Sequence, residues 1–231
     1  MLIHLAPIYL LIAAACANTE KAIFLGPSTV NIPSTHPTLD DLHVDILTPS
    51  DSAIRTHLSA HFPNASLPHG KATWLILDEL TEGQRYEVRQ PTAFKMATYK
   101  LQTVFETPEL ISELSEYSWS RQSLEGDHNS QHEFATNPQA SNSEREASVL
   151  FLQILAAADY YTMNKTLMRD VPPVYVDIIL DPFVFNILPR SLVPTVGYVV
   201  VVAIASWFMS RHISIWVRNA AVEATSEKKT Q

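Results

Sequence analysis

Hydrophobic residues follow two different patterns along the chain. Residues 22–25, 42–47 and 73–80 are short apolar or alternating segments separated by stretches rich in proline and serine, which is typical of β-strands joined by loops. Residues 192–209 instead form a continuous apolar run without a charged side chain. Because a helix of about 20 apolar residues crosses a bilayer, the sequence predicts a β-domain and one membrane span.

Between these parts the pattern changes twice. Thr107, Pro108 and Glu109 are typical of a helix start, with a capping residue, a proline at the first helical position and an acid in the first turn. Apolar residues then recur at helical spacing, so we expect an amphipathic helix that packs on its own domain. Residues 121–146 are polar and without periodicity, which predicts a disordered loop or linker.

The chain becomes apolar again before the predicted span. The unbroken apolar part of residues 147–163 is too short to cross a bilayer. The pattern fits either a buried helix, or a β-strand in the first half of this segment that completes the β-domain. Residues 174–180 predict a further strand. Residues 181–189 form an apolar approach to the span, and we expect them to contact lipid headgroups or a membrane-embedded partner.

The first 17 residues have the pattern of a secretory signal peptide. An apolar core is followed by Ala15, Cys16 and Ala17, whose small outer residues suit cleavage after Ala17. Cys16 is the single cysteine of the chain, so the mature protein would lack thiols. We therefore expect no disulfide, no thiol chemistry and no thiolate metal site in the lumenal domain.

Residues 73–89 resemble one segment of the fibronectin type III family. That family reads Leu-x-x-Leu-x-Pro-Gly-x-x-Tyr-x-Val-x-Val, and the matching positions here are Leu77, Leu80, Gly83, Tyr86 and Val88. The resemblance implies a tyrosine corner, in which the Tyr86 ring is buried between two sheets and its hydroxyl bonds to the preceding loop.

The resemblance has limits. Glu82 replaces the proline of the family pattern, Gln90 replaces the last valine, and the early strand lacks tryptophan. Pro91 follows so soon that either the sandwich is abbreviated here or a few residues are missing from this chain. The alternative is an ordinary hairpin in an unrelated sandwich.

We therefore expect a mainly β fold: a lumenal fibronectin III- or immunoglobulin-like sandwich with one or two helices, plus a single C-terminal transmembrane helix. The expected boundaries are 1–17 for the signal peptide, 18–120 for the sandwich, 121–146 for the linker, 147–190 for a membrane-proximal lumenal segment, 191–210 for the transmembrane helix and 211–231 for a cytosolic tail.

One group of residues is a candidate metal site. Alternation along the predicted strand 42–47 would place Asp41, His43 and Asp45 on one face, and two carboxylates with an imidazole could hold a divalent cation. Half-buried strands normally alternate in this way, so we favour a solvated polar face. The chain contains five glycines and no nucleophile elbow, phosphate loop or dinucleotide fingerprint. We expect no catalytic residue, no cofactor and no enzyme activity.

Three short motifs concern location. Asn64 and Asn164 are in glycosylation sequons between the signal and the span. Lys228 and Lys229 resemble the dilysine retrieval signal of type I membrane proteins of the endoplasmic reticulum, which the COPI coat reads from the cytosol. We expect a single-pass type I protein of that membrane with its N-terminus in the lumen. A net charge of −8 and scattered basic residues argue against a nucleic-acid partner.

Three functional classes fit this layout. The first is a non-catalytic accessory subunit or assembly factor of a multi-span membrane complex, such as those of glycan or GPI-anchor assembly, the translocon or membrane insertion. The second is a p24-like cargo receptor, although the lumenal disulfide and paired tail phenylalanines of that family are missing here. The third is a lumenal metal-dependent enzyme that uses Asp41, His43 and Asp45.

Overall fold

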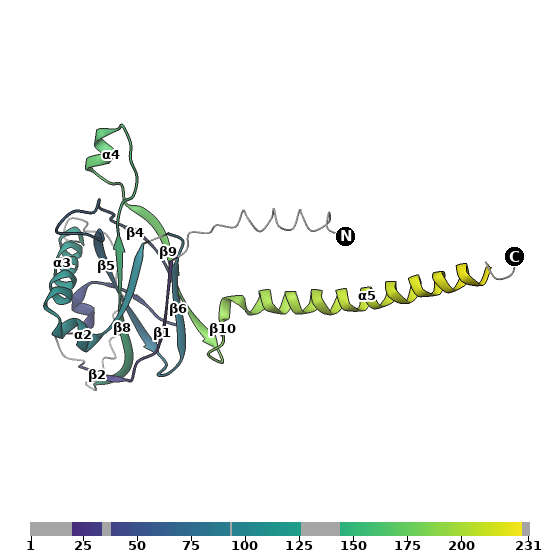
Figure 1. Cartoon of the computed structure of the whole chain (residues 1–231). Coiled ribbons are helices and arrows are strands. Elements are labelled where there is room, and N and C mark those ends of the chain that lie inside the picture. The colour runs from purple at the N-terminus through teal and green to yellow at the C-terminus, as the bar shows by residue number, and fades with distance from the viewer. Residues whose placement is uncertain (1–19, 34–37, 93, 126–143, 228–231) are drawn as a thin grey trace.

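The fold is a sandwich of two β-sheets with helices on one outer face and a long helix that leaves the opposite side. A computed structural model describes residues 20–33, 38–92, 94–125 and 144–227 (Figure 1). The first sheet contains β1 (Glu20–Leu25), β6 (Arg85–Gln90), β9 (Val174–Val184), β10 (Leu188–Pro189) and β4 (Ala53–Leu58). The second contains β2 (Val30–Ile32), β8 (Arg145–Ala156), β5 (Lys71–Leu80), β3 (Asp45–Leu47) and β7 (Lys95–Lys100).

The alternating segments form strands as predicted. Residues 22–25 lie in β1, residues 73–80 in β5 and residues 174–180 in β9. Residues 147–156 belong to a strand, β8, which decides between the helix and the strand that the pattern allowed. Most of β8 is buried, which explains why its sequence shows no alternation. The mainly β fold class is therefore confirmed.

The sandwich extends further along the chain than the expected boundary at residue 120. β8 pairs with β2, β5 and β7, and β9 pairs with β4, β6 and β10. The segment 147–190, which was expected to be a separate membrane-proximal piece, thus supplies the central strand of each sheet. The expected linker 121–146 is also shorter at both ends, because α3 continues to Glu125 and β8 begins at Arg145. Residues 126–143 lie outside the described residues.

The turn between β5 and β6 joins the two sheets and does not close a hairpin within one sheet. The Tyr86 ring is buried with 1% of its surface exposed, and it stacks on Phe24 with 5.8 Å between ring centroids. Its hydroxyl accepts a hydrogen bond from the Thr81 N–H at 2.9 Å and donates one to Gln84 at 3.2 Å. This is the geometry of a tyrosine corner.

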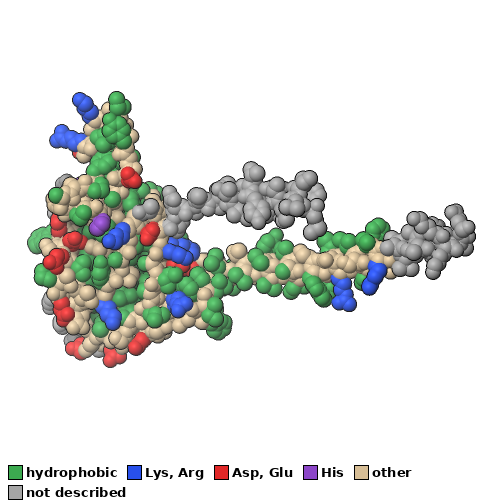
Figure 2. Space-filling view, in the orientation of Figure 1, with side chains coloured by type: hydrophobic (Ala, Val, Ile, Leu, Met, Phe, Trp, Pro, Cys, Tyr) green, Lys and Arg blue, Asp and Glu red, His purple; other side chains and the backbone are tan. Residues whose placement is uncertain are grey.

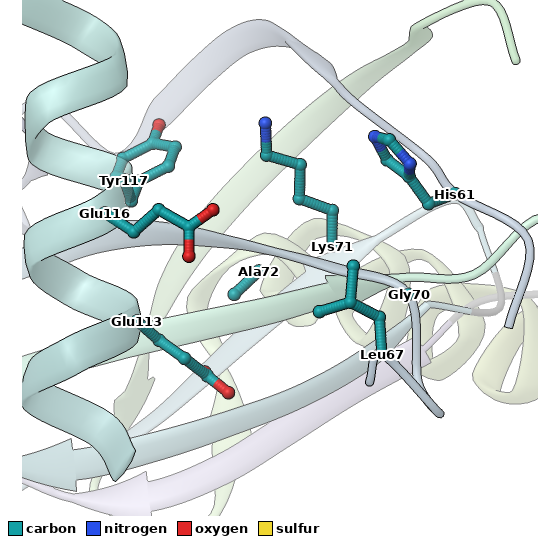
Figure 3. A pocket seen from close by; sticks show the side chains of 8 residues that line it. All are labelled: His61, Leu67, Gly70, Lys71, Ala72, Glu113, Glu116 and Tyr117. Carbon is teal, nitrogen blue, oxygen red and sulfur yellow. The ribbon is translucent and has the colours of Figure 1, made fainter. Parts of the chain in front are cut away.

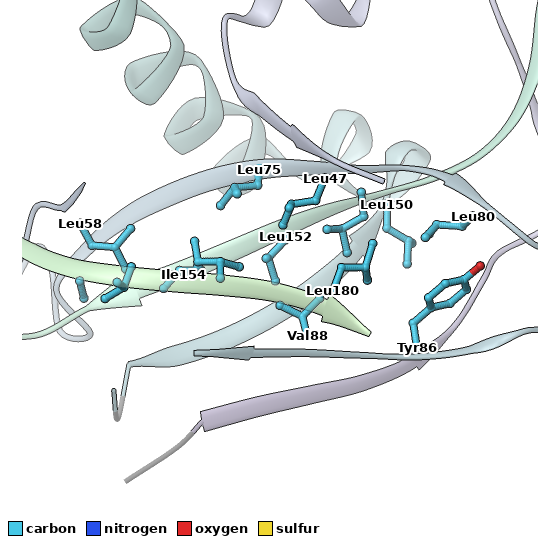
Figure 4. Close-up of a cluster of buried hydrophobic side chains, with 14 of the residues drawn as sticks. Leu47, Leu58, Leu75, Leu80, Tyr86, Val88, Leu150, Leu152, Ile154 and Leu180 are labelled. Carbon is cyan, nitrogen blue, oxygen red and sulfur yellow. The ribbon is translucent and has the colours of Figure 1, made fainter. Parts of the chain in front are cut away.

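The main core lies between the sheets and is aliphatic. Figure 4 shows Val88 and Leu180 of the first sheet facing Leu150 and Leu152 of the second. Each such side chain, when fully buried, contributes about 1.5–3 kcal/mol to folding. The described residues contain no cysteine, so this packing takes the place of disulfides in holding the two sheets together.

A second core lies beneath the helices α2 (Leu101–Glu106) and α3 (Pro108–Glu125), which cover the outer face of the second sheet (Figure 1). Leu114 of α3 packs there with Trp74 and Phe151, whose rings meet edge to face. α3 begins at the predicted proline and packs on its own domain, as expected.

The long helix α5 (Val193–Glu227) projects from the sandwich on the side opposite α3 (Figure 1). Residues 190–219 are long and apolar enough to cross a membrane. No residue in the most apolar 18-residue stretch of this segment is buried. It is the one such helix among the described residues. The helix does not end near residue 210, where a tail was expected to begin, but continues to Glu227. The predicted signal peptide, Lys228 and Lys229 lie outside the described residues.

Candidate functional site

The candidate metal site does not form. Residues 39–42 are a 3-10 helix, η1 (Leu39–Leu42), and His43 has a left-handed φ of 50°, so β3 begins only at Asp45. The predicted strand 42–47, which would have aligned Asp41, His43 and Asp45, is therefore wrong in its first half. Among the residues that the structure describes, no three His, Cys, Asp or Glu side chains are grouped to hold a metal ion.

Local hydrogen bonds explain this difference. The Asp41 carboxylate accepts a hydrogen bond from the Thr38 N–H at 2.6 Å, which caps η1 and competes with an extended conformation. Asp45 is held in another direction, because its carboxylate accepts a bond from Arg121 of α3 at 2.9 Å. These two carboxylates thus have separate structural roles, one in capping and one in fastening α3 to the sheet.

A small cavity of about 160 Å³ lies between α3 and β5 (Figure 3). Its ionisable lining groups are His61, Lys71, Glu113, Glu116 and Tyr117. Burial raises the pKa of Glu113, and the repulsion of Glu116 adds to this, while a 2.6 Å hydrogen bond donated by Gln153 opposes it. Burial also raises the pKa of Tyr117.

These groups are not arranged as a catalytic set. Figure 3 shows that Lys71 comes from β5 and His61 from the segment between β4 and β5. The two glutamates come from α3. In the described part of the chain, no ion pair joins Lys71 to Glu113 or Glu116. Nucleophilic catalysis needs a nucleophile within hydrogen-bond reach of an oriented base, and this cavity provides no such pair.

A network of polar contacts lies where the sandwich meets α5. Asp181 of β9 is buried, with 5% of its surface exposed. Its carboxylate accepts hydrogen bonds from the Ser191 N–H at 3.2 and 3.3 Å and from Arg89 of β6 at 3.4 Å. Arg89 also donates to the Ser191 hydroxyl at 3.1 Å. We call Arg89, Asp181 and Ser191 the joint, because they connect both β6 and β9 to η2 (Arg190–Leu192), the turn from which α5 begins.

A second carboxylate shares this arginine. Glu87 lies directly opposite Asp181 across β6 and β9, and both are buried. Arg89 lies 3.7 Å from the Glu87 carboxylate and 3.4 Å from that of Asp181, and Lys21 lies 3.5 Å from Glu87. Like charges on directly opposed strand residues repel each other, so Arg89 is the group that lets both carboxylates stay buried.

Beside the joint, β9 and β10 are connected by a tight turn, residues 184–187, which we call the membrane-proximal turn because it lies next to α5, the helix that is long and apolar enough to cross a membrane. The Ile187 N–H donates to the Val184 carbonyl at 3.1 Å, and the two central residues, Phe185 and Asn186, have φ values of 52° and 58°. Two positive φ values indicate a type I′ turn, where asparagine is favoured and phenylalanine is unusual. Phe185 is 90% exposed and Ile187 is 80% exposed.

The membrane-proximal turn is fastened to the tyrosine corner. The Asn186 side chain accepts a hydrogen bond from the Arg85 N–H at 2.8 Å and donates one to the Gly83 carbonyl at 3.0 Å. The Arg85 guanidinium lies over the Phe183 ring, 5.8 Å from its centroid. The exposed tip is therefore held by the sandwich and is not a loose loop.

The remaining predicted residues are placed as follows. Leu80 is buried and Gly83 has a φ of 73° in the corner, beside Tyr86. Asn64 and Asn164 are exposed, and each side-chain oxygen accepts a hydrogen bond from the backbone N–H two residues later, at 2.9 and 3.0 Å.

Sequence reasoning treated residues 181–189 as one apolar approach to the span, whereas residues 181–184 are the end of β9, where Asp181 and Phe183 are buried, and it missed the joint. Its only signal was a polar residue, Asp181, at the start of that apolar segment. Comparison of the chain with protein-family models, curated proteins and solved structures gave no match.

Proposed function

We propose that this protein is a non-catalytic accessory subunit of a membrane complex of the endoplasmic reticulum, with the sandwich in the lumen and α5 as its single span. The observation that carries the proposal is the joint. Arg89, Asp181 and Ser191 connect two strands of the sandwich to the turn before α5, so the lumenal domain has a set height and orientation above the membrane.

The course of the chain supports a stiff connection. β9 ends at Val184, β10 is Leu188–Pro189, and η2 (Arg190–Leu192) leads directly into α5 at Val193. No stretch of glycine and serine separates the sandwich from the span. A subunit that presents a surface to a membrane-embedded neighbour benefits from such rigidity, because the ordering cost of binding is already met. A p24-like receptor that collects diverse cargo would gain more from a flexible stalk.

The composition of α5 is consistent with an anchor. Residues 192–209 contain no Asp, Glu, His, Lys or Arg, whereas charged groups inside the membrane usually mark transport or proton paths. On the face shown in Figure 2, acidic and basic side chains are scattered over the sandwich, and the first part of α5 carries none. We place the activity in a multi-span partner, with glycan or GPI-anchor assembly, translocation and membrane insertion as the candidate processes.

We propose that the lumenal domain is fibronectin type III-like. The supporting observations are the crossing from β5 to β6 between sheets and the hydrogen bond from the Thr81 N–H to the Tyr86 hydroxyl. This architecture serves as a scaffold in many proteins and names no reaction by itself.

The test is affinity purification of the tagged full chain in mild detergent, followed by mass spectrometry. We expect one multi-span protein in near-stoichiometric amount. A variant with a short Gly-Ser insertion between Pro189 and Arg190, which loosens the joint, should lose that protein. The same insertion after Tyr161, in the loop before α4 (Lys165–Arg169), is the matched control and should retain it. Recovery of coat proteins with diverse soluble cargo would instead support the receptor.

The membrane topology and the cellular location of the protein are tested separately. Asn64→Gln and Asn164→Gln should each remove one endoglycosidase H-sensitive shift on a gel, because both side chains are exposed. Absence of any shift in the unmutated chain would argue against a lumenal sandwich. Changing Lys228 and Lys229 to serine together should move the protein to the Golgi or cell surface. Unchanged reticular staining would defeat the dilysine interpretation.

A further inference from the structure

The membrane-proximal turn exposes two large apolar side chains beside the start of the span. We propose that Phe185 and Ile187 insert into the lumenal headgroup region of the bilayer that α5 crosses, and so form a second membrane contact of this chain. The occupant of this surface is lipid. This inference rests on the proposed membrane insertion of α5 but not on the identity of any partner.

The height of the turn supports this contact. Residues 192–209, at 1.5 Å per residue, form about 27 Å of apolar helix, close to the thickness of the hydrocarbon core of about 30 Å. Leu192 then lies near the lumenal edge of that core. Only β10 and η2 separate the turn from α5, and Figure 1 shows β10 beside the first turn of the helix. The tip of the turn is therefore at the level of the headgroups.

The conformation of the turn indicates that its exposure is imposed. A non-glycine residue in the left-handed region is strained, and phenylalanine lacks the short polar side chain that makes asparagine acceptable there. Phe183, two residues earlier, is buried in the sandwich, whereas Phe185 is held outside by the hydrogen bonds of Asn186. Large apolar side chains that the fold holds in an exposed position are typical of a surface that contacts a membrane or another protein.

The charges around the turn suit a headgroup layer. Arg85 and Arg190 are both exposed on its two sides, and an arginine can bind lipid phosphate while its neighbour inserts. Glu82 lines the same shallow hollow as Phe185, which offsets part of this positive charge. We therefore expect binding to neutral phosphatidylcholine, with little further gain from anionic lipid.

The experiment uses the full chain with Cys16→Ser and one new cysteine, Ile187→Cys, labelled with the fluorophore NBD. The protein is reconstituted into phosphatidylcholine vesicles with and without lipid that carries a nitroxide near the headgroup. We expect several-fold stronger quenching at position 187 than at the control Tyr161→Cys. Tyr161 is similarly exposed, at 82%, but lies in the loop before α4 (Figure 1). Phe185→Cys is a second probe in case the first disturbs the turn, and it should show the same quenching.

Equal, weak quenching at positions 185, 187 and 161 would overturn the inference. If the label at 187 in native membranes is shielded both from a water-soluble quencher and from the nitroxide lipid, the surface is covered by a protein, and the lipid assignment fails while the subunit proposal stands. Strong quenching in vesicles, together with failure to recover any stoichiometric partner, would leave the lipid contact intact and remove the proposed function instead.

Discussion

The backbone N–H of Ser191 points at the carboxylate of Asp181 and donates to it at 3.2 Å. The bond joins the turn before the span to the central strand of the first sheet, and its acceptor is buried. A charged acceptor strengthens such a bond relative to a neutral one. Motion of α5 relative to the sandwich must therefore break a hydrogen bond to a charged acceptor.

Replacement of Arg89 tests the charge arrangement behind this contact. Arg89→Met leaves Glu87 and Asp181 buried and opposed without their shared cation, so we expect a loss of about 3 kcal/mol of folding free energy. Thermal unfolding of the full chain in detergent, followed by fluorescence of the buried Trp74, measures this. The control is Arg55→Met, whose pair with Asp177 is exposed and contributes at most about 1 kcal/mol. Equal losses in the two variants would contradict the role of Arg89.

The tyrosine corner is tested by removal of one oxygen atom. Tyr86→Phe keeps the buried ring but leaves the Thr81 N–H without its acceptor, and we expect a loss of about 1 kcal/mol. Tyr175→Phe changes a tyrosine that is 58% exposed and should fall within about 0.5 kcal/mol of the unmutated chain. Denaturant titration of both variants checks the difference. No loss in Tyr86→Phe would mean that water replaces the hydroxyl at no cost.

Two glycines at the same corner are required for different reasons. A Cβ added at Gly26 would lie 2.1 Å from the Thr81 carbonyl oxygen, so Gly26→Ala forces backbone movement, and we expect a loss of about 3 kcal/mol. Gly83 has open space around it but a φ of 73°, so Gly83→Ala should lose only about 1 kcal/mol through backbone strain. Unfolding midpoints of the two variants should fall in that order. The reverse order would show that the approach of residues 26 and 81 relaxes easily.

Glu113 predicts a pH dependence of stability. Burial raises its pKa above the ordinary value of 4.5, so the folded protein binds this proton more tightly than the unfolded chain does. The resulting contribution to the free energy of unfolding is fully present below pH 4.5. It is lost as the pH rises through the raised pKa of Glu113. Glu113→Gln keeps an acceptor for Gln153 and removes the partly buried charge. We therefore expect a higher melting temperature than the unmutated chain at pH 7, with the gain vanishing in acid.

The control for this experiment is Glu116→Gln, because that carboxylate is exposed on the same helix and lines the same cavity. Its gain at pH 7 should be smaller. A melting difference for Glu113→Gln that does not change with pH would show that its effect comes from packing and not from the titration of the carboxyl group.

The sequence alone determined the features that depend on local order. Apolar segments next to turn residues identified β1 and β5, the Thr107-Pro108-Glu109 start identified α3, and the unbroken run at 192–209 identified the one described helix that is long and apolar enough to cross a membrane. The resemblance of residues 73–89 to the fibronectin type III pattern also implied that the Tyr86 ring is buried and its hydroxyl bonded, as the structure shows.

The tertiary structure decided the features that depend on distant partners. β8 is a strand because a continuously apolar segment can be buried as helix or strand, and only pairing across the sheet chooses between them, and the same pairing places β8 and β9 at the centre of the two sheets. Asp41 and Asp45 separated because one caps η1 and the other meets Arg121 of α3. The joint connects residues 92 and 102 positions apart, so no local pattern could show that Arg89, Asp181 and Ser191 meet at the base of the span.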